Sequence, residues 1–170
     1  MFLTGFFLFC NLVLLLFTLA ILARLTYRIV TVQGHSMQPT FVEGDRVLAI
    51  SWWPKRYLRK GQIVLFRPWY AEQPTFYYDS PLSEQLHIKR IVALAGETVK
   101  TSLNDIREEA RSQFAPYHNE HGIRTWSIPA QHLFVCGDNH MESTDSLIAG
   151  PLSLRNVCGI VLMKLPKIFF

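Results

Sequence analysis

The 170-residue sequence has few cysteines and none of the common metal-binding or phosphate-binding motifs. Its three cysteines are too few for the disulfide framework of a small secreted domain. Cys136 and Cys158 are predicted to be small buried residues rather than a disulfide pair. The sequence contains no H-E-x-x-H, no paired C-x-x-C and no glycine-rich phosphate loop, so we expect neither a metal nor a cofactor.

Charged residues are also scarce, at 18% of the chain, whereas hydrophobic residues reach 49%. This balance excludes an intrinsically disordered chain and is typical of a globular protein held at a membrane. A net charge of +4 is compatible with nucleic acid or anionic lipid as a partner. The basic residues are scattered apart from one cluster in residues 55–60, so a lipid bilayer is the favoured partner and no nucleic acid is expected.

An uncharged apolar segment extends from Phe2 to Leu22. About 20 apolar residues in a helix span the ~30 Å hydrocarbon core of a bilayer. A cleaved signal peptide would have a basic stretch before a shorter apolar segment, and no basic residue precedes this one. We therefore predict a retained transmembrane anchor at residues 1–26.

Residues 27–170 have the pattern of a mostly β domain, with short β-branched segments separated by glycine and proline turns. Strands are predicted within 27–32, 44–50, 61–66, 87–94, from 98 onward, and within 133–136 and 157–163. Residues 69–86 are predicted as an ordered loop or short hairpin. Residues 101–126 are predicted as a polar, irregular insert.

Ser36 is a candidate nucleophile, because it lies beside glycine and before proline on a tight connection. Its base is either a histidine, as in a Ser-His-Asp triad, or a lysine whose pKa is lowered by burial. His35 would project to the opposite face of an extended segment. Lys89 is the best lysine, because apolar residues surround it in the predicted strand 87–94. Taken alone, a lysine in a strand is more often a solvated residue, so the motif context must decide.

Four motifs follow one another in the order of a known family. Ser36–Thr40 has the pattern S-M-x-P-T, and Gly44–Leu48 has the pattern G-D-x-V-L. Lys89–Val99 has the pattern K-R-[VI]-[IV]-x-x-x-G-[DE]-x-V, and Gly137–Ser146 has the pattern G-D-N-x-x-x-S-x-D-S. The sequence resembles the type I signal peptidases, the membrane-bound Ser-Lys proteases that include the mitochondrial inner membrane peptidases.

This resemblance implies a signal-peptidase-like β domain that removes N-terminal signal peptides from exported preproteins. By position, Ser36 would be the nucleophile, with its backbone N–H as an oxyanion donor, and Lys89 the general base. Ser143 would hydrogen-bond the lysine ammonium and orient it. Asp145 would support this end of the site, with Arg90 as its partner.

Two residues depart from the family pattern. Gly34 stands where some members have a serine whose hydroxyl completes the oxyanion hole. Leu147 stands where the last motif usually continues with arginine, so an arginine contact to Asp145 from that position is lost. The role left to Asp145 is therefore open.

The resemblance places the catalytic domain on the outer face of a cell membrane, or alternatively in the mitochondrial inner membrane. Arg24 and Arg28 oppose an outer location, because positive residues after an anchor favour the cytoplasmic side. A dedicated maturation protease of the same family is a second function, and a non-catalytic membrane-tethered adaptor is a third.

Overall fold

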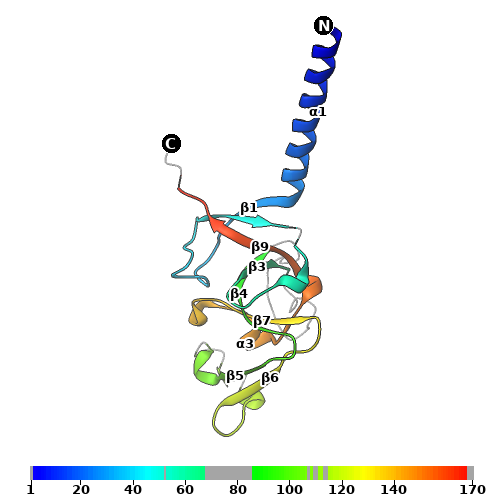
Figure 1. Ribbon diagram of the computed structural model, residues 1–170. Helices are drawn as coiled ribbons and strands as arrows, with labels where there is room; N and C mark the ends of the chain where they lie inside the picture. Colours follow the sequence, from blue (N-terminus) through cyan, green and yellow to red (C-terminus); the bar gives the residue numbers. More distant parts are fainter. Residues whose placement is uncertain are drawn as a thin grey trace.

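The computed structural model describes residues 2–51, 53–67, 86–106, 108, 111–112 and 115–167. One long N-terminal helix, α1 (Phe2–Thr26), projects away from a domain built mostly of β-strands (Figure 1). This arrangement confirms the predicted fold class. The predicted loop or hairpin at 69–86 lies outside the described residues except for its last residue.

Helix α1 is long and apolar enough to cross a membrane. Its 25 residues extend over about 38 Å at ~1.5 Å per residue. The segment Phe9–Thr26 has a mean hydropathy of 2.1, and none of it is buried against the rest of the protein. Its apolar side chains therefore have no protein core to pack against.

The helix continues directly into the first strand, β1 (Tyr27–Thr31). β1 pairs antiparallel with β2 (Arg46–Ile50), from Tyr27 opposite Ile50 to Thr31 opposite Arg46. The carbonyl of Thr26 accepts a hydrogen bond of 2.7 Å from the backbone N–H of Ser51. The junction between α1 and the sheet is thus fixed by the bond to Thr26 and by the pairing of β1 with β2.

A seven-stranded antiparallel sheet forms the body of the domain, in the order β1-β2-β9-β3-β4-β7-β8. Its other strands are β9 (Val157–Lys164), β3 (Ile63–Phe66), β4 (His87–Leu94), β7 (His132–Cys136) and β8 (Leu152–Ser153). The short helices are η1 (Lys55–Tyr57), η3 (Leu103–Asp105), η4 (Ala115–Tyr117), η5 (His140–Glu142), α3 (Ser146–Ala149) and η6 (Leu154–Asn156). Strand β4 lies inside the sheet, between β3 and β7.

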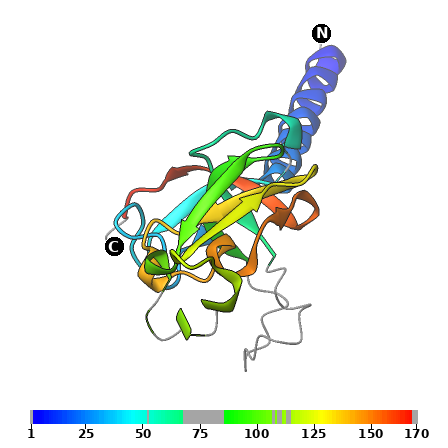
Figure 2. The same ribbon diagram turned by 90° about the horizontal axis from the view of Figure 1, so that it is seen from below.

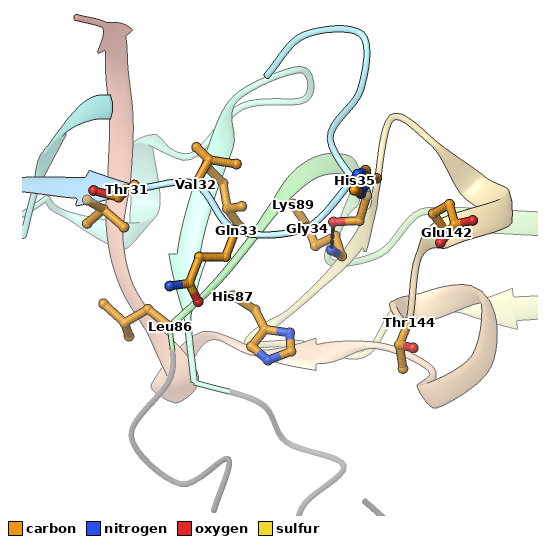
Figure 3. A pocket seen from close by; sticks show the side chains of 13 residues that line it. Thr31, Val32, Gln33, Gly34, His35, Leu86, His87, Lys89, Glu142 and Thr144 are labelled. Atoms are coloured by element: carbon orange, nitrogen blue, oxygen red, sulfur yellow. Dashed lines mark hydrogen bonds between the residues drawn. The ribbon is translucent and has the colours of Figure 1, made fainter. Parts of the chain in front are cut away.

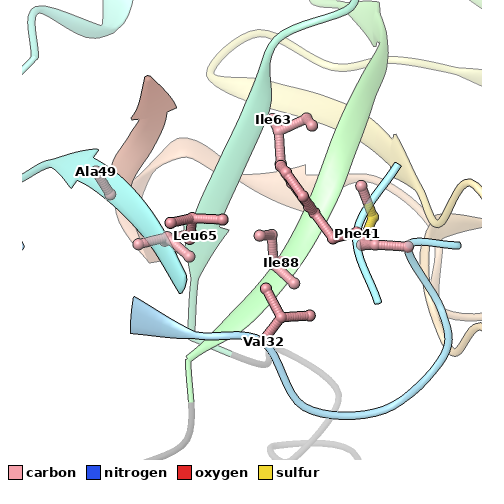
Figure 4. Close-up of a cluster of buried hydrophobic side chains, with 8 residues drawn as sticks. Val32, Phe41, Ala49, Ile63, Leu65 and Ile88 are labelled. Carbon is pink, nitrogen blue, oxygen red and sulfur yellow. The ribbon is translucent and has the colours of Figure 1, made fainter. Parts of the chain in front are cut away.

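The side chains of β3 alternate between two core clusters, as expected for a strand covered on both faces. Ile63 and Leu65 belong to one cluster, and Val64 and Phe66 belong to the other. The first cluster also contains side chains from the loop after β1, and Figure 4 shows Val32 and Phe41 of this loop among the buried side chains. Packing into the core therefore holds this loop on the sheet.

Residues 101–126 were predicted to be irregular, and this is wrong at both ends. Strands β5 (Thr98–Ser102) and β6 (Ile123–Ser127) pair antiparallel as a separate two-stranded sheet, at the end of the domain far from α1 (Figures 1 and 2). β6 alternates between exposed and half-buried residues, and its Trp126 ring lies 6.0 Å from the Phe134 ring. The sequence does not show this alternation, because the exposed face includes Ile123 and the half-buried face includes Arg124. The division of the chain at residue 26 remains a prediction.

Cys136 and Cys158 are both free thiols. Cys136 is buried and Cys158 is half-buried. The prediction that they do not form a disulfide pair is confirmed.

Candidate active site

Ser36 lies in the loop between β1 and β2, where a glycine sets the backbone direction. Gly34 has a φ of +76°, a left-handed conformation in which any other residue would be strained. A serine at this position, as in some relatives, would therefore be unfavourable here. Met37, directly after Ser36, is 1% exposed within the first core cluster. Ser36 is thus held between the turn at Gly34 and the buried side chain of Met37.

Lys89 reaches Ser36 from the neighbouring strand β4. Its Nζ lies 2.6 Å from Ser36 Oγ, although the two residues are 53 positions apart (Figure 3, dashed line). Lys89, and not a histidine, is the candidate base whose hydrogen bond to the Ser36 hydroxyl the structure shows. The structure therefore brings together the predicted serine and lysine.

Burial gives Lys89 the character required of a base. The residue is only 4% exposed and lies opposite Val64 of β3. Desolvation lowers the pKa of its amine, against the smaller opposing effects of Asp145, Cys136 and Asp138. Its apolar surroundings differ in part from those predicted, because Val92 of the same strand is 39% exposed. Ile88 and Ile91 of the same strand are buried as predicted.

The Ser143 hydroxyl donates to Asp145 Oδ2, at 2.5 Å. This bond leaves the Ser143 oxygen able to accept, so the predicted hydrogen bond between Lys89 and Ser143 stays a prediction. A buried carboxylate is the stronger acceptor and must be compensated by donors. Asp145 is 0% exposed and also accepts from the backbone N–H groups of Gly137 and Leu147. These bonds connect the residues of the loop beside Lys89, while the charge of Asp145 opposes the lowering of the pKa of Lys89.

The predicted partnership of Arg90 with Asp145 is wrong, because Arg90 pairs with Asp138. Arg90 Nε and Nη2 donate to the two oxygens of Asp138 at 2.8 and 2.7 Å. Thr40, four residues after the serine, donates to Asp138 Oδ2 at 2.5 Å. Asp138 is not among the site residues predicted from the sequence. The adjacent residues Lys89 and Arg90 could have indicated this ion pair from the sequence. Side chains alternate along a strand, so Arg90 points away from the face of Lys89 and needs an acidic partner there.

Asp138 joins the three chain segments that make up the site. Thr40 belongs to the serine loop, Arg90 to the lysine strand, and Asp138 to the segment that follows β7. A further link is the hydrogen bond of 3.0 Å from the backbone N–H of Asn139 to the carbonyl of Ser36. The relative position of serine and lysine is therefore fixed by contacts outside the pair itself.

Gly137 and Leu147 complete the packing of this segment. A Cβ atom at Gly137 would lie 2.5 Å from both Ser143 Oγ and the Ser36 carbonyl oxygen, so only glycine fits. Leu147 is buried in an apolar cluster with Phe134 and Cys136. Leucine therefore replaces the usual arginine with a core contact.

A groove with a volume of about 460 Å³ contains the serine and lysine (Figure 3). One wall is the segment 30–36, the other is the segment 86–89, and Glu142 and Thr144 also line it. The ladder between β4 and β7 begins only at Arg90, so the preceding residues of β4 face the groove. The groove thus has the form of a gap between two extended segments.

Three residues near the site carry metal-ligand atoms, namely Cys136, His140 and Asp145, within 4.8 Å of one another. The Asp145 carboxylate already accepts three hydrogen bonds from the loop around it. Burial also raises the pKa of the Cys136 thiol, which disfavours the thiolate that binds metals. A metal would have to compete with both effects.

Comparison with known proteins agrees with the motifs. The family described as "Signal peptidase, peptidase S26" matches residues 6–165. The chain belongs to this signal peptidase family. It is 35% identical over 141 residues to thylakoidal processing peptidase 1 of Arabidopsis thaliana, covering 76% of this chain and 39% of that protein.

Two further relatives come from bacteria and mitochondria. Signal peptidase I V of Bacillus subtilis is 26% identical over 149 residues, covering 76% of this chain and 80% of that peptidase. Mitochondrial inner membrane protease subunit 2 of Danio rerio is 31% identical over 149 residues, covering 84% of this chain and 65% of that subunit. The relatives of this chain therefore include a thylakoidal processing peptidase, a bacterial signal peptidase and a subunit of a mitochondrial inner membrane protease.

Proposed function

We propose that the protein is a membrane-bound serine endopeptidase that cleaves N-terminal signal peptides from exported preproteins by a Ser-Lys dyad. The observation that carries this proposal is the hydrogen bond of 2.6 Å between Lys89 Nζ and Ser36 Oγ, made by a lysine that is 4% exposed. Membership of the signal peptidase family supports the same reaction.

In this mechanism the unprotonated Lys89 amine accepts the proton of the Ser36 hydroxyl. The serine oxygen attacks the scissile carbonyl, and the resulting ammonium then protonates the leaving amine. Burial supports this role, because it lowers the pKa of Lys89 and so raises the fraction of the amine that can act as a base.

The backbone N–H of Ser36 is the proposed oxyanion donor. Within the described residues it makes no hydrogen bond to the protein, so it is available to a substrate oxygen. Each fixed donor of this kind contributes about 2.7–4 kcal/mol to transition-state stabilisation. Gly34 adds no side-chain donor, so the second donor must be a backbone group or water.

The substrate is proposed to bind as an extended segment in the groove. Segments 30–36 and 86–89 flank the groove, and an extended peptide between them would add a strand to the sheet. This geometry would place the scissile carbonyl at Ser36 and Lys89, with substrate side chains alternating between the two sides of the peptide.

We place α1 across the membrane, with the β domain on the outer face. The length and hydropathy of α1, and the absence of buried residues in Phe9–Thr26, support the span. The choice of the outer face comes from the proposed substrates, which are cleaved after export. The mitochondrial inner membrane is the alternative, supported by the mitochondrial relatives of the chain.

The proposal is tested by processing of a model preprotein with the purified full-length protein in detergent. Ser36→Ala and Lys89→Met should each abolish processing while leaving the protein folded. Ser127→Ala and Lys100→Ala are matched controls, because both residues are exposed on the β5–β6 hairpin. Full processing by Lys89→Met at neutral pH would exclude lysine as the base.

Two alternatives are separated by further measurements. Labelling of Ser36 by an acylating inhibitor would exclude a non-catalytic adaptor, which would not react. A dedicated maturation protease would cleave one precursor, whereas a general signal peptidase would cleave many. Profiling of uncleaved precursors after deletion of the gene distinguishes these two.

A further inference from the structure

The loop that carries Ser36 is closed at its base by backbone hydrogen bonds. The N–H of Val32 donates to the carbonyl of Asp45 at 2.8 Å, and the N–H of Gly44 donates to the carbonyl of Val32 at 2.9 Å. Ser36 follows Val32 by only four residues. The loop from Val32 to Asp45 therefore leaves and rejoins the sheet at one place, and a movement of this base would move the nucleophile.

The side chain of Asp45 is buried at this base, with an exposure of 0%. Its Oδ2 accepts a hydrogen bond of 2.9 Å from the backbone N–H of Val42, within the same loop. Lys164, the last residue of β9, places its Nζ 2.5 Å from the same oxygen, and Lys167 Nζ lies 3.8 Å from Oδ1. A buried carboxylate needs donors of this kind. One carboxylate thus joins the serine loop to the end of β9.

Asp45 carries its charge at neutral pH. The hydrogen bonds from Lys164 and from the N–H of Val42 hold the pKa of its carboxyl below the usual range, although desolvation opposes them. A backbone hydrogen bond of 2.8 Å, from the N–H of Leu165 to the carbonyl of Arg46, lies beside the ion pair. The end of β9 is therefore attached to the base of the loop by a charged contact and by a backbone contact (Figure 1).

The contacts described above for the candidate site hold a different part of the loop. Asn139 binds the carbonyl of Ser36, and Asp138 binds the hydroxyl of Thr40. The pair at Asp45 supplies a second attachment, at the base, and two attachments are needed to fix the direction of a loop. A displacement of about 1 Å in a reacting atom can lower a rate about 100-fold. Loss of the second attachment should therefore be visible in the chemical step.

We propose that Asp45 and Lys164 are positioning residues for the nucleophile, because their ion pair fixes the base of the loop and so keeps the Ser36 hydroxyl at Lys89. This inference rests on the proposed endopeptidase function. Both residues act through the loop rather than on the substrate. A pair that only stabilised the fold would change Tm and leave kcat of the folded protein unaltered.

The chain offers a matched carboxylate away from the serine loop. Glu97 accepts a hydrogen bond from the backbone N–H three residues before it, that of Leu94, as Asp45 does from Val42. Glu97 also pairs with a lysine, Lys60, at 3.0 Å. It lies in the turn between β4 and β5. Glu97→Gln therefore repeats the chemical change without altering the base of the serine loop.

The test measures kcat and KM for one preprotein with the full-length protein in detergent, and Tm on the same samples. Asp45→Asn should lower kcat about tenfold, with a smaller change in KM, because the reacting atoms are displaced. Lys164→Gln should lower kcat about three- to fivefold, since Lys164 is 43% exposed and solvent screens its charge. Lys164→Arg should restore kcat to within twofold of wild-type, because it keeps the charge.

Hydrogen exchange gives a readout that does not depend on activity. The amides of Val32 and Gly44 should exchange faster in Asp45→Asn than in the wild-type protein, because the base of the loop opens locally. Glu97→Gln should leave both this exchange and kcat at the wild-type level.

A lower Tm with unchanged kcat in Asp45→Asn and Lys164→Gln would overturn the inference, because the pair would then act on stability alone. Equal decreases of kcat in Glu97→Gln and Asp45→Asn would overturn it as well. If Asp45→Asn does not fold, the comparison of Lys164→Gln with Lys164→Arg decides, and equal kcat in these two variants contradicts the inference. Absence of cleavage by the wild-type protein above the Ser36→Ala background is a different result, because it contradicts the proposed function itself and this inference with it.

Discussion

Asp138→Asn removes the charge that joins three segments of the candidate active site while keeping the size of the side chain. In the structure the carboxylate accepts two hydrogen bonds from Arg90 and one from Thr40. The side chains of Arg90 and Asp138 are only 32% and 16% exposed, so solvent screens the ion pair incompletely. The substitution should therefore have a larger effect than the loss of a surface ion pair.

The expected magnitude follows from these contacts. Hydrogen bonds to charged groups contribute about 1.5–3 kcal/mol each, and partial exposure reduces the net loss for the ion pair to about 2 kcal/mol. For a chain of this size the loss corresponds to a decrease in Tm of about 4–8 °C. We also expect kcat to fall about tenfold or more, because small displacements of reacting groups are costly.

Thermal unfolding in detergent, followed by circular dichroism, measures the change in stability, and steady-state cleavage of a preprotein measures kcat. Lys60→Gln is the matched control, because the Lys60–Glu97 pair at 3.0 Å is 55% and 39% exposed and should contribute at most about 1 kcal/mol. Combined Arg90→Gln and Asp138→Asn should be less destabilising than the sum of the single changes. The reasoning is refuted if Asp138→Asn has no more effect than the control, or if the two changes are additive.

Three further predictions concern the base and its support. The kcat/KM for cleavage should rise with pH, and the midpoint of this rise should lie below pH 10.5, because desolvation lowers the pKa of Lys89 and only its unprotonated amine is a base. A kcat/KM that is constant from pH 6 to 9, with chemistry rate-limiting, would contradict this prediction. Gly137→Ala should lower kcat about 100-fold, because the added Cβ would displace Ser143 or Ser36. Wild-type activity in this variant would show that the loop accommodates the Cβ without moving the serine. Leu147→Arg should lower the free energy of unfolding, measured with denaturant, by about 3 kcal/mol or more, because it buries a charge among apolar side chains. Leu147→Met should lower it by less than about 1.5 kcal/mol. Equal losses in the two variants would contradict the apolar environment of Leu147.

Local patterns in the sequence predicted most of the strands. The β-branched segment 87–94 has the bounds of β4, and the predicted strand 27–32 extends one residue beyond β1. Strand β6 was missed because its exposed face includes Ile123 and its half-buried face includes Arg124, so polarity does not follow burial along it. The alternation becomes visible only when Trp126 is known to pack against Phe134.

The candidate site was predictable from motifs but its internal contacts were not. The motifs pointed to Ser36 and Lys89, which the fold brings within 2.6 Å. The choice of partners within the site depends on three-dimensional positions that spacing does not encode. Arg90 therefore pairs with Asp138 rather than with Asp145, and the Ser143 hydroxyl donates to Asp145.

The direct passage from α1 into β1 has a consequence for where a substrate is cut. If α1 spans the bilayer as proposed, the five residues of β1 connect the end of the span to the loop that carries the nucleophile, and this strand runs across the direction of the helix rather than along it (Figure 1). No residue separates α1 from β1, and the backbone N–H of Ser51 donates to the carbonyl of Thr26 at their junction. The distance between the Ser36 hydroxyl and the lipid headgroups is therefore fixed by the fold. The enzyme would then cleave each precursor at a constant distance from the membrane surface. The groove would select which of the peptide bonds at that distance is cleaved.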